Sequence, residues 1–448
     1  MSNNPGLSYE DTPPFSAPLR FFLTAPLFGV ALGVLLLLDP GLLDSRWSPG
    51  ALAAVHLLAA GFMLQVMIGA LQQIMPVVAG AQLPRPLLIA GLTHPLSSLG
   101  ALALASGLGL MLPALIIGGA LLLVSGLLVF LVGAGLAILR SPRLATASHT
   151  PRDLRLALAG LAITLSLGLL LAFSLAQGLN LPFVTLSFAD LVDLHASWGV
   201  LGWASLLLAA TSWVVVPMFQ ITPSYPDLFG RWYAPGLFAA LLLWSGLRIA
   251  EQNAAWLILG LLLLAAITSF AVITLRLQAR TRRSKPDASF RAFRVAMFAF
   301  ASGTLILASN AVHDHPLASV LAAILILHGG FGGAISAMLY KIVPFLSWLH
   351  LSQAGIRRPP SVKKLLPDSR IQRQLRVHHL SLALLCLASL LSAFAPAGTN
   401  LTASLVTRLA GLALIVEFGW LLHNIWHTLS NWQQARLLAN TGPAGPEK

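Results

Sequence analysis

Apolar runs of about twenty residues recur along this chain from Phe21 almost to its C-terminal end, with few charged residues between them. Each run is long enough to cross a hydrocarbon core roughly 30 Å thick. Of the 448 residues, 57% are hydrophobic and 9% are charged, whereas a soluble domain carries about 25% charged residues. The chain therefore cannot present an ordinary aqueous surface, and we predict an all-α integral membrane protein.

The apolar runs divide into twelve predicted transmembrane helices, which together form a membrane domain at 19–428. Residues 1–18 are polar and Pro-rich and are expected to form an N-terminal cytoplasmic tail, with 429–448 as the C-terminal tail. A long cytoplasmic loop is expected at 349–377. The helices are predicted at 19–39, 51–78, 86–108, 112–139, 153–177, 190–217, 233–250, 254–276, 292–310, 317–346, 378–396 and 402–428.

Lys and Arg collect in alternate loops, near 140–155, 276–285 and 357–376, while the other loops are short and neutral or acidic. The positive-inside rule then places both termini in the cytoplasm. We expect a multi-pass protein of the bacterial inner membrane, with the lipid bilayer as a partner. Because these loops account for the net charge of +13, nucleic acid is not an expected partner. The single cysteine, Cys386, excludes disulfides and Cys-x-x-Cys-His attachment of c-type haem.

Three of the predicted helices share a layout in which a histidine is followed by glycine and, near the inner end, by proline. The histidines are His56, His195 and His328, spaced 139 and then 133 residues apart. All three helices run inward, so each histidine lies in the outer half of the bilayer, roughly 8 Å below the helix start for the first two and roughly 16 Å for the third. The recurrence predicts three pseudo-symmetric four-helix units at about 19–139, 153–276 and 292–428.

An imidazole in lipid is costly unless its nitrogen atoms find partners, so histidines at these depths indicate a functional site. Glycine lets another helix or a flat macrocycle approach the backbone. Two interpretations stay open from the residues alone: the three histidines hold a haem or a metal, or each is hydrogen-bonded to a neighbouring helix.

Histidines on helices two, six and ten of a twelve-helix chain resemble the heme-copper oxidase superfamily. The spacing His56-x4-Gly61-x7-Gly69-x6-Pro76 also resembles the NnrS family of haem- and copper-containing proteins tied to nitric oxide stress. The resemblance implies haem b with His56 and His328 as axial ligands, and a copper or second-site ligand at His195. It also implies redox chemistry or nitric oxide binding, a small gas ligand, and a quinone or cytochrome as electron donor.

The sequence departs from the oxidase pattern at the binuclear site. The seventh predicted helix contains no histidine, and helix ten has His328-Gly329-Gly330 where the family has His-x-His. A proton-pumping oxygen reductase is therefore excluded. If the protein is an enzyme, we expect an oxidoreductase.

Further polar residues lie near the membrane and carry open alternatives. Arg248 could pair with a haem propionate or extend to the interface. His94 could be an extra ligand or a partner for a backbone carbonyl. His423 and His427, four residues apart on one helix face, could form a metal or proton site with Glu417 and Asn424, or hydrogen-bond at the interface. His313 and His315, around Asp314, could bind a metal or a haem propionate, but a solvated loop is the default interpretation. Gln72 and Gln73 could hydrogen-bond between helices or line a path for a quinone or proton, and the first is favoured. Met63, Met67 and Met75 could bind copper(I), but packing is favoured. His378 and His379 are expected to be headgroup contacts.

Two other classes of function remain open at the sequence level. Twelve spans interrupted by Pro and Gly are common in transporters, here for a metal, haem or small solute. A catalytically silent assembly subunit of a respiratory complex is the other class.

Overall fold

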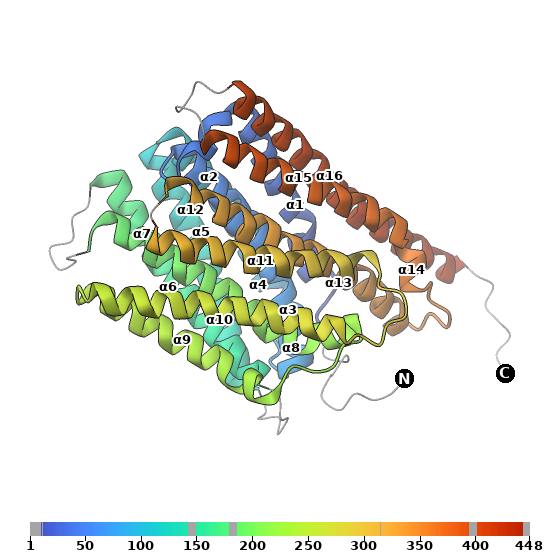
Figure 1. The fold of residues 1–448 in the computed structure, drawn as a ribbon. Coiled ribbons are helices and arrows are strands. Elements are labelled where there is room, and N and C mark those ends of the chain that lie inside the picture. The colour runs from blue at the N-terminus through green and yellow to red at the C-terminus, as the bar shows by residue number, and fades with distance from the viewer. Residues whose placement is uncertain are drawn as a thin grey trace, which may run out of the picture.

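The computed structural model describes residues 10, 12–141, 149–178, 186–313, 315–393 and 401–441 (Figure 1). These residues form helices and connecting segments, without strands, which confirms the all-α class. Among them, eleven helical segments are long and apolar enough to cross a membrane.

The helices of the first half of the chain are α1 (Ser16–Leu38), η2 (Pro40–Asp44), α2 (Pro49–His56), η3 (Leu57–Met63), α3 (Leu64–Ala79), α4 (Pro86–Leu110), α5 (Pro113–Arg140), α6 (Thr150–Gln177), α7 (Phe188–Ser197), η4 (Trp198–Ser205) and α8 (Leu206–Gln220). Those of the second half are α9 (Asp227–Ile249), α10 (Asn253–Ala279), α11 (Ala288–Val312), α12 (Pro316–Ala323), η5 (Ile324–Gly332), α13 (Gly333–Gln353), α14 (Val362–Leu365), α15 (Asp368–Ala393) and α16 (Leu401–Thr441).

The helix corresponding to the seventh predicted span, α9, is not among the eleven apolar segments. It has 23 residues, but Trp232, Tyr233, Pro235 and two arginines make it less apolar than the others. Eleven of the twelve predicted spans therefore correspond to described helices that are long and apolar enough to cross a membrane.

A π-helical turn interrupts three long helices, and these are the three that carry the recurrent histidines. η3 follows His56 directly, η4 begins three residues after His195, and η5 contains His328. π-helical turns are rare and cluster at functional sites, because they reposition side chains and loosen the backbone hydrogen-bond ladder. In the described part of the chain these are the three π segments, so the sequence repeat coincides with a conformational repeat.

The packing of the helices recurs in the same order along the chain. Each π segment packs on the long helix that precedes its own span in the chain: η3 packs on α1, η4 on α6, and η5 on α11. Antiparallel neighbours pair as α4 with α5, α9 with α10, and α15 with α16. The second helix of each pair packs in turn on one of the helices that contact a π segment: α5 packs on α6, α10 on α11, and α16 on α1. The contact of α16 with α1 closes the bundle into a ring.

Glycines let these helices approach to backbone contact. A Cβ on Gly160 of α6 would lie 1.9 Å from the carbonyl oxygen of Gly202 in η4, and a Cβ on Gly33 of α1 would lie 2.6 Å from that of Gly411 in α16. Between α4 and α5, a Cβ on Gly119 would lie 2.3 Å from the backbone nitrogen of Leu104. Small residues at such crossings are typical of membrane helices, which associate by close packing.

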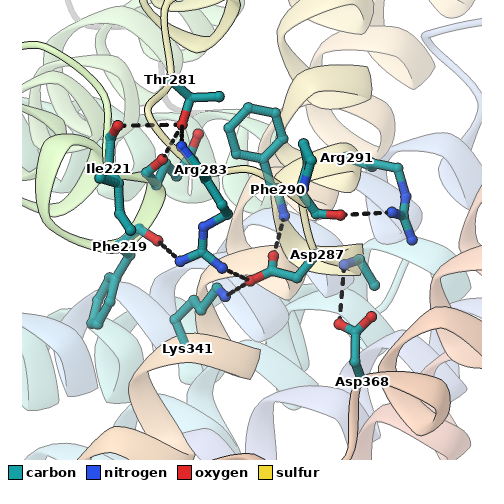
Figure 2. Close-up of polar contacts among 12 residues, drawn as sticks. Phe219, Ile221, Thr281, Arg283, Asp287, Phe290, Arg291, Lys341 and Asp368 are labelled. Atoms are coloured by element: carbon teal, nitrogen blue, oxygen red, sulfur yellow. Dashed lines mark hydrogen bonds and ion pairs between the residues drawn. The ribbon is translucent and has the colours of Figure 1, made fainter.

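A polar network ties several helix ends together around Asp287 (Figure 2). Its carboxylate caps α11 by accepting from the Phe290 amide at 3.0 Å. The same carboxylate accepts from Arg283 at 2.6 Å and from Lys341 of α13. Arg283 also donates to the Phe219 carbonyl of α8 at 2.9 Å. Asp287 thus links the start of α11 to Lys341 within α13 and, through Arg283, to the end of α8.

The start of α1 and the later part of α16 lie at the same end of the bundle. The ring of Phe15 stacks on His350, near the end of α13, with centroids 4.9 Å apart, and contacts Trp432 of α16 edge-on at 5.5 Å. The ring contacts therefore place the two ends of the described helical bundle on one side.

Helices extend into segments expected to be loops or tails. α13 continues to Gln353, α15 begins at Asp368 rather than 378, and α16 continues to Thr441. Hydropathy placed those boundaries where charge increases, but a helix continues through charged residues when one face stays buried. The predicted end of the eleventh span, at 394–396, lies outside the described residues.

Candidate metal centres

His56, the last residue of α2, and His195, near the end of α7, lie with their imidazole rings close together. Their ring centroids are 6.3 Å apart and the ring planes differ by 11°. Each histidine lies seven residues after the start of its helix, roughly 10 Å along the axis. Both side chains are partly buried.

Backbone carbonyls fix the protonation of both rings. Nδ1 of His56 lies 2.8 Å from the Leu52 carbonyl oxygen, and Nδ1 of His195 lies 3.1 Å from that of Thr164. A carbonyl oxygen only accepts hydrogen bonds, so each Nδ1 carries the proton and each Nε2 keeps its lone pair. Metal-binding histidines typically have this arrangement, with the second nitrogen bonded to a carbonyl.

The separation of the rings matches that of two imidazoles on opposite sides of one metal ion. A metal–nitrogen bond is about 2.0–2.1 Å, and the ring centre lies about 1.2 Å behind the nitrogen, so such centroids lie about 6.4 Å apart. The observed centroid distance of 6.3 Å is close to this value, and the ring planes are nearly parallel. The two imidazoles are therefore near enough to bind one ion together.

Contacts around α7 hold His195 in place. Asp193 accepts from Arg46, just before α2, at 2.9 Å. Asp190 completes a capping box with Ser187 at the start of α7 and accepts from Arg248 of α9 at 2.7 Å. A Cβ on Gly168 of α6 would lie 2.9 Å from the His195 ring, so glycine leaves room for the imidazole.

The third recurrent histidine, His328, belongs to a different cluster. Its Nε2 donates to one carboxylate oxygen of Glu417 in α16 at 3.1 Å, and Nδ1 of His378 in α15 donates to the other at 2.8 Å. The three side chains are at most 2% exposed, and one potential ligand atom from each lies within 4.8 Å of the others. These three residues could hold a metal ion.

Aromatic and glycine residues enclose this His328–His378–Glu417 cluster. Phe418 lies edge-on to His328 with ring centroids 6.4 Å apart, and Phe331 is 1% exposed in the same π segment. A Cβ on Gly333 would lie 3.0 Å from Nε2 of His378. The second nitrogen of His328, Nδ1, is buried and has no hydrogen-bond partner among the described residues.

The interpretation of His378 as a headgroup contact was wrong, because its side chain is 1% exposed and bonded to Glu417. The signal was present in the sequence, since Ile371, Leu375, His378 and Leu385 follow the helical period and are all buried. The predicted helix began at 378 and so left out the part of this buried helix face that precedes His378. Its neighbour His379 is partly buried, and the ring centroids of the two histidines are 5.7 Å apart.

Most other candidates have local protein partners. His94 bonds Thr24 at 2.8 Å, His423 lies 3.4 Å from Arg370, and His427 lies 3.3 Å from Asn431. Asn424 donates to Tyr340 at 3.1 Å, so Glu417, Asn424, His423 and His427 do not form one group. Arg248 contacts Asp190, Asn253 and the Trp256 ring.

The last candidates divide between packing and solvent. Met63, Met67 and Met75 are buried in the core, and His313 is exposed, while Asp314 lies outside the described residues. Gln73 donates to Thr12 at 3.4 Å, whereas both side-chain polar atoms of Gln72 are buried without a partner among the described residues.

No protein-family model matches this chain, and no curated protein is significantly similar to it.

Proposed function

We propose that this chain is a haem-binding membrane protein of electron transfer, in which His56 and His195 would hold the haem. The observation that carries the proposal is the pair of nearly parallel imidazoles, 6.3 Å apart, with both Nδ1 atoms on backbone carbonyls. The pairing differs from the resemblance-based expectation of His56 with His328, because His328 bonds Glu417 instead.

The residues around the pair would keep both Nε2 atoms unprotonated and able to bind a metal. The Leu52 and Thr164 carbonyls fix the two tautomers, and Gly168 leaves space for the second ring. The Arg46–Asp193 contact ties the segment before α2 to α7. A bound haem b supplies one-electron redox chemistry at a potential that its axial ligands and surroundings set.

Two protein ligands on one haem favour electron transfer over gas binding, because no axial position is left open. We propose a quinone or a cytochrome as the electron donor. Nitric oxide or oxygen would bind only if one imidazole dissociated, so the nitric oxide role is the less favoured form of the proposal. Copper(I) is the competing occupant, since two imidazoles also suit that ion.

We also propose twelve spans in three four-helix units, with α9 as the twelfth span, in the bacterial inner membrane. The recurring helix contacts and the three π segments support the threefold arrangement. An even number of crossings agrees with Phe15 and Trp432 lying at one end of the bundle. The basic loops favour the cytoplasm for that end.

The test is a haem assay, a metal analysis and a reduced optical spectrum of purified full-length protein. The proposal predicts about one haem b per chain and a reduced α-band that carbon monoxide does not change. Copper without haem would assign the pair to copper, and absence of both would overturn the proposal. Solute flux in proteoliposomes without a bound cofactor would instead favour a transporter.

A further inference from the structure

The His328–His378–Glu417 cluster lies within the membrane-spanning part of the bundle and not at its surface. His378 is ten residues into α15 and Glu417 is sixteen into α16, roughly 15 Å and 24 Å along their axes. Ionisable groups in such positions are rare and mark functional sites. We propose that these three residues form a second, non-haem metal site for a divalent first-row transition-metal ion, with iron(II) and zinc as the ions that suit it.

The donor set is two imidazoles and one carboxylate. This set binds iron(II) in non-haem oxygenases and zinc in several hydrolases, in both cases with coordination positions left open. Magnesium and calcium prefer all-oxygen sites. The chemistry of the donors therefore selects nitrogen-preferring transition metals.

The distances fit coordination without rearrangement of the backbone. Neighbouring ligand atoms around a six-coordinate ion with bonds of about 2.1 Å lie about 3.0 Å apart. The two histidine–carboxylate distances are 3.1 and 2.8 Å. On binding, each neutral imidazole would carry its proton on the ring nitrogen that faces away from the ion, so that Nε2 of His328 and Nδ1 of His378 offer their lone pairs.

Two features go beyond what a hydrogen-bonded core cluster requires. Nδ1 of His328 is buried without a partner among the described residues, so it can take up the ring proton when Nε2 binds an ion without giving up a hydrogen bond. Gly333 follows the π segment directly, and a Cβ there would press on Nε2 of His378. The cluster thus has space reserved for an imidazole that comes from another helix.

The second site does not depend on haem being bound at His56 and His195. Its residues come from η5, α15 and α16, while the axial pair comes from α2 and α7. The two centres are neighbours, because η3 contacts η5 and Phe62 of η3 lies 4.9 Å from Phe418 between their ring centroids. A protein with both sites would carry two metal centres in adjacent helices.

Zinc is the probe, because iron in a bound haem does not add to the zinc content that elemental analysis measures. Full-length protein is stripped with a chelator, equilibrated with zinc, desalted and subjected to elemental analysis. We expect one tightly bound zinc per chain in the wild type and in the control His423→Gln, whose side chain on α16 faces Arg370. We expect at least about a tenfold loss of affinity in Glu417→Gln and in His378→Gln.

A second readout guards against misfolded variants. Zinc should raise the unfolding temperature of the wild type and of His423→Gln but not that of His378→Gln, with helical circular dichroism retained in all. No bound zinc in the wild type would overturn the proposal, as would tight binding retained by either Glu417→Gln or His378→Gln. Haem content is measured on the same samples, so failure of this site and failure of the axial pair are distinguished.

Discussion

At the scale of single residues, the backbone decides what the imidazoles can do. The Leu52 and Thr164 carbonyls force the proton onto Nδ1 of His56 and His195, leaving Nε2 free to bind. His328 instead uses Nε2 to donate to Glu417. Histidines that look equivalent in the sequence therefore have different chemistry, and the difference comes from the acceptor that each ring meets.

Gly168→Ala is a test of the space reserved for His195. The added methyl group would lie 2.9 Å from the ring, so the imidazole must move while α6 stays folded. We expect haem affinity to fall roughly tenfold, the scale at which groups that orient a ligand act. Haem titration measures the affinity, and Gly236→Ala is the control because its added methyl group has nothing within 4 Å. Equal affinity in both variants would contradict the proposed role of His195.

Asp287 gives a pH dependence of stability. Burial acts to raise the pKa of its carboxyl, but the hydrogen bond and charge of Lys341, with the Phe290 amide and Arg283, outweigh burial and hold the pKa below its usual value. A pKa depressed by folding stabilises the protein above the unfolded value of about 4 and loses that effect as pH falls below it.

We therefore expect Asp287→Asn to lower the free energy of unfolding by about 2 kcal/mol at pH 7. The difference from wild type should shrink as pH falls below about 4. Denaturant unfolding in detergent at pH 7 and at pH 3–4 measures both. Asp227→Asn is the control, since that carboxylate is 88% exposed, and a pH-independent loss for Asp287→Asn would contradict the account.

At the scale of helices, hydropathy identified most of the spans, because a run of about twenty apolar residues has few other folds available. It did not reveal the π segments, which depend on local backbone strain rather than composition. Nor could it pair His378 with Glu417, since the two residues are 39 positions apart and meet only when α15 packs on α16. The histidine repeat pointed to the three helices that carry π segments, but not to which of their rings lie close together.

The contact of α6 with η4 leaves no room for a side chain at Gly160. A methyl group there would lie 1.9 Å from the Gly202 carbonyl oxygen, which is backbone and cannot rotate away. We expect Gly160→Ala to lower the free energy of unfolding by about 1–3 kcal/mol, as overpacking does. Thermal unfolding measures this loss of stability, with Gly118→Ala as the control because a Cβ there has nothing within 4 Å. Equal stability of the two variants would argue against the close crossing of α6 and η4.

At the scale of the whole molecule, the ring of helices closes when α16 packs on α1. The sequence contains the information for this closure as Gly33 and Gly411, but single glycines cannot be matched across nearly 400 residues without the fold. Closure also brings the two ends of the described bundle together, which restricts how often the chain can cross the membrane.

Reporter fusions decide whether α9 crosses. We predict that a reporter active only in the cytoplasm works when fused before Ser16 and also after Thr441. The reporter should be inactive when fused after Ala250, on the opposite side. Termini on opposite sides would show that the chain crosses an odd number of times and would remove α9 from the membrane.

The axial pair of His56 and His195 is tested most directly by the reduced spectrum of two variants, His195→Ala and His328→Gln, with and without carbon monoxide. We predict that His328→Gln keeps the wild-type α-band and its insensitivity to carbon monoxide. His195→Ala should lose the haem or become sensitive to carbon monoxide, because one axial position opens. The reverse result, with His328→Gln altered and His195→Ala unchanged, would contradict the account.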